Sequence, residues 1–122
     1  MKILVAEDDL MVQEMLVTVL TDLGHVVQAV DNGDKLIKLA LESKPDLILT
    51  DMHMPQMRGD SMIAMLEMYE PLAGVPVIMI TGASAGEIAD AGLPEGITVI
   101  PKPLDLAKLS AEVQKAAARL GK

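Results

Sequence analysis

The feature that most constrains the fold is an alternation between short apolar runs and segments of helical periodicity. Five runs rich in branched apolar residues lie at residues 2–7, 26–30, 46–51, 75–80 and 97–100. After each run, apolar residues recur every three or four positions, which is typical of an amphipathic helix. Strands that alternate with helices predict a parallel sheet covered by helices on both faces. We therefore expect an α/β protein built from five βα units.

Local signals set the limits of the expected helices. Asp9 is a plausible cap for the first helix, which should end before Gly24, and Asp105 is a plausible cap for the last. The fourth helix should be short, because Gly92 and Pro94 stop it. The other helical patterns lie around Leu36 to Leu41, from about Asp60 to Tyr69, and from about Leu106 to Leu120. The first, third and fourth apolar runs lack a polar side and should form the central strands.

Length and composition exclude several classes of protein. The 122 residues fit one domain, so we interpret residues 1–122 as a single compact unit. The absence of cysteine rules out disulfides, thiolate metal sites and a cysteine nucleophile, and favours a cytoplasmic location over secretion. A net charge of -8 disfavours direct nucleic-acid contact, and no apolar run is long enough to predict a membrane span.

Polar residues gather where the expected strands end. Ligands of an open α/β sheet bind beyond the carboxyl ends of the strands. The residues at those places are Glu7, Asp8 and Asp9 after the first run, Asp51 at the end of the third, Thr81 and Gly82 after the fourth, and Lys102 after the fifth. The first and third strands of a doubly wound sheet are neighbours. We therefore expect Asp51 to lie close to the acids at residues 7–9.

These residue types together suit phosphoryl transfer. Several carboxylates in one pocket repel one another unless a cation joins them. Oxygen ligands in this number suit Mg²⁺, and Mn²⁺ is also possible. Lys102 adds a positive charge, Thr81 adds a hydroxyl donor, and Asp51 is a nucleophilic carboxylate.

The sequence resembles response-regulator receiver domains, the chemotaxis-type phosphoacceptor modules of two-component systems. The resemblance covers the whole chain and rests on "LVAEDD", "LILTDMHMP", the Gly59 that follows, "VIMITG" and "VIPKPL", in this order. It implies a flavodoxin-like doubly wound (βα)5 fold with a five-stranded parallel sheet in the order 2-1-3-4-5. It also implies a signalling phosphoacceptor that catalyses only its own phosphorylation and dephosphorylation, and is otherwise not an enzyme.

The resemblance assigns roles to the residues at the strand ends. It implies that Asp51 is phosphorylated, that Asp8 binds Mg²⁺ directly, and that Glu7 binds it through water. Glu7 stands where the family more commonly has aspartate, so its contact with the ion is expected to be longer. The resemblance further implies that Thr81 hydrogen-bonds the phosphoryl group. Lys102 would pair first with Asp51 and later with the phosphate.

The resemblance also implies that the backbone carbonyl of His53 completes the metal shell and that the Lys102–Pro103 bond is cis. The His53 side chain could influence how fast water attacks the phosphoryl group, or it could be an exposed loop histidine without a further role. Asp9 is interpreted as a helix cap. The loop after Asp51 contains Pro55 and Gly59, which turn chemistry alone explains.

Two features depart from the family or stay ambiguous. Many receivers carry an aromatic residue three positions before the lysine, where this chain has Val99. With a shortened fourth helix as well, we expect ordering of the loop from Thr81 to Gly86 to carry more of the response.

The methionines near the third helix are read as core filler, or alternatively as an adaptable docking surface. These methionines are Met52, Met54, Met57, Met62, Met65 and Met68.

The sequence therefore predicts a stand-alone receiver, monomeric or weakly dimeric. It would accept a phosphoryl group from a sensor histidine kinase or a phosphotransfer domain, and signal through protein contacts. One alternative is a pseudo-receiver that binds partners without being phosphorylated. Another is a phosphatase with an aspartate nucleophile, in which His53 would have to replace the usual second acid. A flavin carrier of the same topology would need aromatics flanking the ring and a hydroxyl-rich phosphate loop, and this chain, with Tyr69 as its one aromatic residue, has neither.

Overall fold

The computed structural model describes residues 1–53, 58–94 and 97–120, with the side chains at 59 and 60 excepted. Its five strands form one parallel sheet in the order β2-β1-β3-β4-β5, which confirms the predicted flavodoxin-like topology. The strands are β1 (Lys2–Ala6), β2 (Val26–Val30), β3 (Leu47–Asp51), β4 (Val77–Thr81) and β5 (Thr98–Pro101). The termini of the described chain lie at the edge of the sheet away from the acid-rich strand ends.

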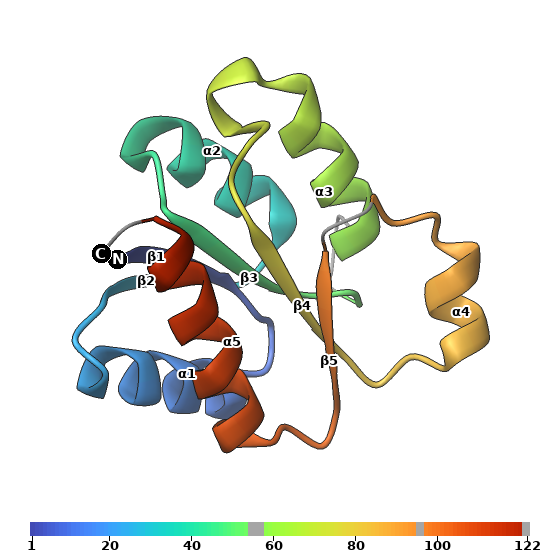
Figure 1. The fold of residues 1–122 in the computed structure, drawn as a ribbon. Helices are drawn as coiled ribbons and strands as arrows, with labels where there is room; N and C mark the ends of the chain where they lie inside the picture. The colour runs from blue at the N-terminus through green and yellow to red at the C-terminus, as the bar shows by residue number, and fades with distance from the viewer. Residues whose placement is uncertain (54–57, 95–96, 121–122) are drawn as a thin grey trace.

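Helices cover both faces of the sheet (Figure 1). Two helices, α1 and α5, lie on one face, and α2 and α3 lie on the other. The helices are α1 (Leu10–Asp22), α2 (Gly33–Ser43), α3 (Gly59–Met68), α4 (Ala85–Asp90) and α5 (Leu106–Arg119), with a short 3₁₀ helix η1 (Glu70–Leu72) before β4. The η1 turn was not predicted from the sequence. Within the described ranges, none of these helices has both the length and the apolar character needed to span a bilayer.

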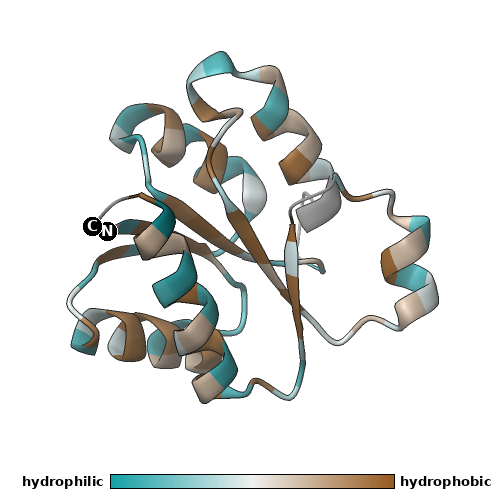
Figure 2. Cartoon of the chain, in the orientation of Figure 1, coloured by the Kyte–Doolittle hydropathy of each residue, from teal (hydrophilic) through white to brown (hydrophobic). Residues whose placement is uncertain are grey.

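The sheet separates two apolar layers, and its central strands β3 and β4 are coloured as hydrophobic in Figure 2. Side chains of alternate positions on each strand enter opposite layers, as the period of two in a β-strand requires. Leu4 and Ile48 pack with α2 and α3, whereas Ile3 and Leu49 pack with α1 and α5. The central strands β3 and β4 are buried along their whole length, as their apolar runs predicted.

Side-chain caps begin most helices at the carboxyl ends of the strands. Asp9 accepts hydrogen bonds from the first turn of α1, and Asp105 does the same for α5, which confirms both predicted caps. Asn32 and Ser84 cap α2 and α4 in the same way, and the sequence analysis did not assign them. The capped helix starts follow the carboxyl ends of the strands, which is the edge of an open α/β sheet where ligands bind.

Helix α4 differs from the other four. It is as short as predicted and contains no buried residue. Gly92, just beyond its end, has a φ of +64°, a left-handed conformation that glycine adopts without a steric penalty and that commonly ends a helix. In Figure 1, α4 lies out to the side of the sheet, beyond β5.

The methionines near α3 divide between interior and surface. Met52 and Met62 are fully buried in the layer between the sheet and α2 and α3, as the core interpretation predicted. Met65 is partly buried against that layer, and Met68 is 81% exposed at the end of α3. Met54 and Met57, like Pro55, lie outside the described residues.

Candidate functional site

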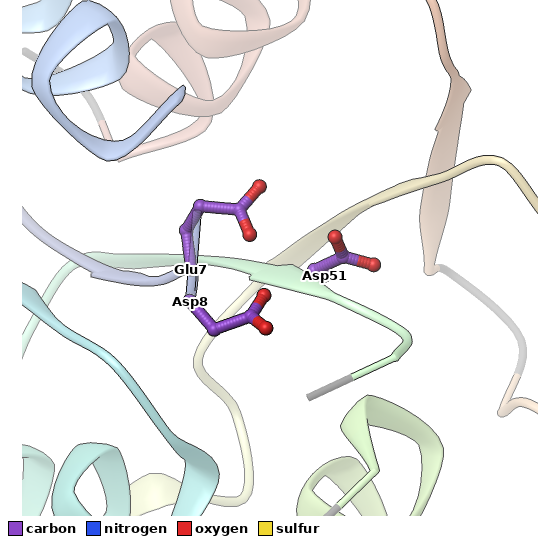
Figure 3. A group of neighbouring side chains, drawn as sticks. All are labelled: Glu7, Asp8 and Asp51. Carbon is purple, nitrogen blue, oxygen red and sulfur yellow. The ribbon is translucent and has the colours of Figure 1, made fainter. Parts of the chain in front are cut away.

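Three carboxylates meet at the carboxyl edge of the sheet (Figure 3). The β1–β3 register pairs Ala6 with Thr50, so the residues that follow β1 lie beside the end of β3. One carboxylate oxygen each from Glu7, Asp8 and Asp51 lies within 4.8 Å of the others. Glu7 and Asp51 are buried and Asp8 is exposed. The predicted proximity of Asp51 to the acids after β1 is therefore confirmed.

Lys102 reaches this cluster from the end of β5. Its Nζ lies 2.6 Å from Oδ2 of Asp51 and 3.5 Å from Oε1 of Glu7. Its backbone N–H donates to the carbonyl of Thr81 at 2.9 Å, which joins the ends of β4 and β5. The Lys102–Pro103 peptide bond is cis, as the family resemblance implied.

Burial and neighbouring charges shift the pKa of two groups. Burial, assisted by the negative charge of Asp51, raises the pKa of Glu7 above its ordinary value of 4.5, although the Asp9 N–H and Lys102 oppose the rise. For Lys102, burial alone would lower the pKa. The hydrogen bond and charge of Asp51, with the charge of Glu7, outweigh burial and raise the pKa of the ammonium. Lys102 therefore keeps its proton to a higher pH than a free lysine does, and Glu7 keeps its proton to a higher pH than a free glutamate does.

Both carboxylate oxygens of Asp51 have a defined partner. Oδ1 of Asp51 accepts the backbone N–H of His53 at 3.0 Å, so Lys102 and His53 hold one oxygen each. Thr81 is fully buried at the end of β4, and Ile80, the residue before it in the strand, pairs with Asp51. The hydroxyl oxygen of Thr81 accepts the N–H of Ala83 at 3.0 Å. A hydroxyl that accepts one hydrogen bond still has its own proton to donate.

One residue of this region was missed by the sequence analysis. Oε2 of Glu87, in α4, lies 3.0 Å from Nε2 of His53 and 3.6 Å from a guanidinium nitrogen of Arg58. The stretch "SAGE" at residues 84–87 matches a capping-box pattern, and Ser84 does accept the N–H of Glu87. That pattern correctly indicates a helix start, but it does not reveal that the carboxylate meets the loop after Asp51.

The position of the expected family aromatic is filled by a small side chain. Val99 is partly buried and packs against the layer formed with α2 and α3. Ile100, beside it in β5, faces the opposite layer. A ring that could move between surface and interior is therefore not available at residue 99.

Comparisons with known proteins agree with this geometry. A family model described as the response regulator receiver domain matches residues 3–114. The probable transcriptional regulatory protein SilR of Salmonella typhimurium is 36% identical over 115 residues, which are 93% of this chain and 50% of that protein. The chain spans about half the length, or less, of the first curated relatives that it matches.

Two solved structures have the same fold. The signal receiver domain of a signal transduction histidine kinase from Syntrophus aciditrophicus has a TM-score of 0.88 and 29% identity, and the match covers 96% of this chain and 89% of that one. The receiver domain of the sensor histidine kinase PA1611 from Pseudomonas aeruginosa PAO1, solved with a magnesium ion in its active-site cleft, has a TM-score of 0.83 and 28% identity, over 93% and 94% of the two chains. With its family match, strand order and acidic cluster, the chain belongs to the response regulator receiver domains of two-component systems.

Proposed function

We propose that this chain accepts a phosphoryl group on Asp51 from a phosphohistidine of a sensor histidine kinase or of a histidine phosphotransfer domain. The observation that carries the proposal is the position of the Asp51 carboxylate. It lies 2.6 Å from the ammonium of Lys102, in a group with Glu7 and Asp8 whose oxygens are within 4.8 Å of one another. Residues 1–122 would act as a single receiver domain.

The donor set fits a divalent cation. The three carboxylates bring more negative charge than the one ammonium that pairs with Glu7 and Asp51 can balance. Mg²⁺ takes one or two carboxylates with several waters, and Mn²⁺ accepts the same oxygen ligands. We assign Asp8, Asp51 and the backbone carbonyl of His53 as its direct ligands, and Glu7 as a ligand through water. When bound, the ion would neutralise charge on the oxygens of the transferring phosphoryl group.

In the transfer step, a carboxylate oxygen of Asp51 forms a bond to phosphorus while the N–P bond to the donor histidine breaks. The electron pair of that bond returns to the imidazole nitrogen. Lys102 already lies against Asp51 and would exchange this contact for the phosphoryl oxygens. The Thr81 hydroxyl, whose oxygen accepts the N–H of Ala83, would keep its proton and donate it in a hydrogen bond to a second phosphoryl oxygen.

The phosphorylated domain would signal through protein contacts and not by turnover of an external substrate. The added charge on Asp51 biases the loops at the carboxyl edge between two arrangements that a partner can distinguish. A net charge of -8 makes nucleic acid a poor ligand for this surface. Because the kinase draws its phosphoryl group from ATP, we place this activity in the cytoplasm, with the domain monomeric or weakly dimeric.

The direct test is chemical phosphorylation followed by intact-mass measurement. The protein is incubated with acetyl phosphate in the presence of Mg²⁺, Mn²⁺ or a chelator, alongside the Asp51→Asn variant. The wild type should gain one labile phosphoryl group only when the cation is present, and Asp51→Asn should gain none. Asp22→Asn is the matched control, because Asp22 is an exposed aspartate at the far end of α1 and should leave the adduct unchanged.

Other outcomes would identify the alternatives. A folded wild type that never forms an adduct would contradict the proposal and indicate a pseudo-receiver that acts by binding alone. Rapid hydrolysis of unrelated phosphate esters that depends on Asp51 would indicate a phosphatase. An adduct that persists in Asp51→Asn would place the phosphoryl group on another residue.

A further inference from the structure

Helix α1 contacts the acidic cluster through one glutamine. The side-chain nitrogen of Gln13 donates to the backbone carbonyl of Glu7 at 2.9 Å and to the carbonyl of Val30 at 3.1 Å. Val30 also accepts the backbone N–H of Glu7 at 3.0 Å. One partly buried amide therefore joins α1 to the ends of β1 and β2 at the point where the acids begin.

The carbonyl that Gln13 holds belongs to the peptide between Glu7 and Asp8. Because a peptide unit is planar, holding this carbonyl constrains ψ of Glu7 and φ of Asp8 together, and so restricts the directions in which the two acid side chains leave the backbone. Other bonds hold the same short segment. The Asp9 N–H donates to a Glu7 carboxylate oxygen at 3.3 Å, and the Asp9 side chain caps α1.

The geometry of Gln13 fits a role in the cation site better than a role in packing. Leu16 and Leu20 already fix α1 on the sheet, and both are buried in the layer shared with α5. Gln13 itself is polar and only partly buried. Its side-chain amide nitrogen donates to two carbonyls, at the edge of the sheet where Glu7 and Asp8 lie close to Asp51.

We propose that Gln13 is a positioning residue for the divalent cation. By holding the Glu7–Asp8 peptide, it pre-arranges the two acids for the ion without touching it. The inference rests on the proposed function, because it assumes that the cluster binds Mg²⁺. Loss of an outer hydrogen bond at a metal site typically weakens metal binding at least tenfold, and we expect about tenfold weaker Mg²⁺ binding without the amide of Gln13.

The test uses two variants and one matched control. Gln13→Met keeps the length of the side chain but has no donor, and Gln13→Asn keeps the amide but is too short to reach both carbonyls. Gln28→Met makes the same change at an exposed glutamine of β2. Mg²⁺ binding is measured by calorimetry, and the amide signal of Asp8 is followed by NMR in the metal-free protein. The Mg²⁺ dependence of phosphorylation by acetyl phosphate is measured in parallel.

The proposal predicts a specific pattern. Gln13→Met should shift the Asp8 amide signal before any metal is added and weaken Mg²⁺ binding about tenfold. The phosphorylation rate at saturating Mg²⁺ should change little, because Asp51, Thr81 and Lys102 are untouched. Gln13→Asn should behave in the same way to a smaller extent, and it decides the question if Gln13→Met does not fold. Gln28→Met should match the wild type.

A folded Gln13 variant with wild-type Mg²⁺ affinity would overturn this inference even if its melting temperature falls, because the residue would then serve stability alone. A wild type that binds no Mg²⁺ would overturn the cation site itself, and this inference with it. The two failures are distinguishable because the first concerns a difference between proteins and the second concerns the wild type.

Discussion

The acid cluster and helix α4 lie at the same edge of the sheet but are held in different ways. Glu7 and Asp51 are 2% and 7% exposed, and both pair with the ammonium of Lys102. Helix α4 has no buried residue, and its Glu87 meets His53 and Arg58 through side chains that are 39% to 49% exposed. The first region is held by ion pairs between two buried carboxylates and a partly buried ammonium, and the second is joined to it by contacts that solvent screens.

This difference assigns the reaction to the acid cluster and the conformational response to the region around α4. A phosphoryl-transfer site requires fixed distances between nucleophile, cation and counter-charge. A segment with few buried contacts opens at low free-energy cost, and moving elements are commonly drawn from such segments. We therefore expect changes in the acid cluster to alter the reaction, and changes around α4 to alter local motion with little effect on the reaction.

The largest effect is expected for Lys102→Met. This change removes the ammonium that faces Asp51 and would pair with the phosphoryl oxygens. Loss of one positioned electrostatic group typically slows a reaction about a hundredfold or more, and we expect that loss in the initial rate of adduct formation with acetyl phosphate at saturating Mg²⁺. Lys115→Met is the control, because Lys115 pairs only with Glu112 on exposed α5 surface among the described contacts. A rate within about threefold of the wild type would contradict the role given to Lys102.

A smaller effect is expected for Glu7→Gln. It concerns the free energy of unfolding and depends on pH. Because burial raises the pKa of Glu7 in the folded state, the folded protein binds a proton at a pH where the unfolded chain has lost it. The free energy of unfolding of the metal-free wild type should therefore fall as pH rises above 4.5 and through the raised pKa. Glutamine cannot ionise, so Glu7→Gln should lack this fall and be more stable than the wild type above that window.

Denaturant unfolding at several pH values with a chelator measures this difference, and added Mg²⁺ should reverse it by stabilising the wild type more than the variant. Glu42→Gln, at an exposed position of α2, should follow the wild type. Equal pH dependence in Glu7→Gln and the wild type would show that Glu7 does not cause the effect. The burial of the Glu7 carboxylate would then not have the effect on stability that the comparison with α4 assumes.

Much of the acid cluster could be predicted from the sequence, because the end of each strand can be recognised from the order of residues alone. An apolar run that stops at a carboxylate locates Asp51 along the chain, and the parallel order of strands then places it beside the residues after β1. Caps such as Asp9 and Asp105 are equally local, since they bond to residues two or three positions away. Their prediction needed no knowledge of how helices pack.

The contacts of Gln13 and Glu87 could not be predicted in the same way. A half-buried glutamine in α1 and a glutamate in the first turn of α4 both look like ordinary solvent-facing residues in the sequence. Their partners are up to 34 positions away, as the numbering of His53 and Glu87 shows, and the pairing depends on where each helix lies relative to the sheet. The η1 turn was missed for a related reason, because the three residues Glu70–Leu72 are too few to show periodicity.

The smallest effect on stability is expected for Glu87→Gln, which weakens the contacts with His53 and Arg58. Exposed ion pairs contribute roughly 0.2 to 1 kcal/mol, so the global free energy of unfolding should hardly change. Hydrogen exchange of the amides in α4 should nevertheless become about twofold faster, because the helix has no buried side chain to hold it. Adduct formation at Asp51 should keep its wild-type rate.

Glu112→Gln provides the matched comparison, because Glu112 pairs with Lys115 on α5 and that helix is fixed by buried Leu109 and Val113. The same chemical change there should leave amide exchange of α5 unaltered. The structure divides residues 81–86 among the end of β4, a loop at 82–84 and the start of α4. Phosphorylation of the wild type should slow exchange in this segment if it carries the response, and Glu87→Gln should reduce this change. Equal exchange of the loop with and without the phosphoryl group would count against that role. Equal exchange of α4 in the wild type and Glu87→Gln would show that the backbone, and not the Glu87 carboxylate, keeps α4 beside the site.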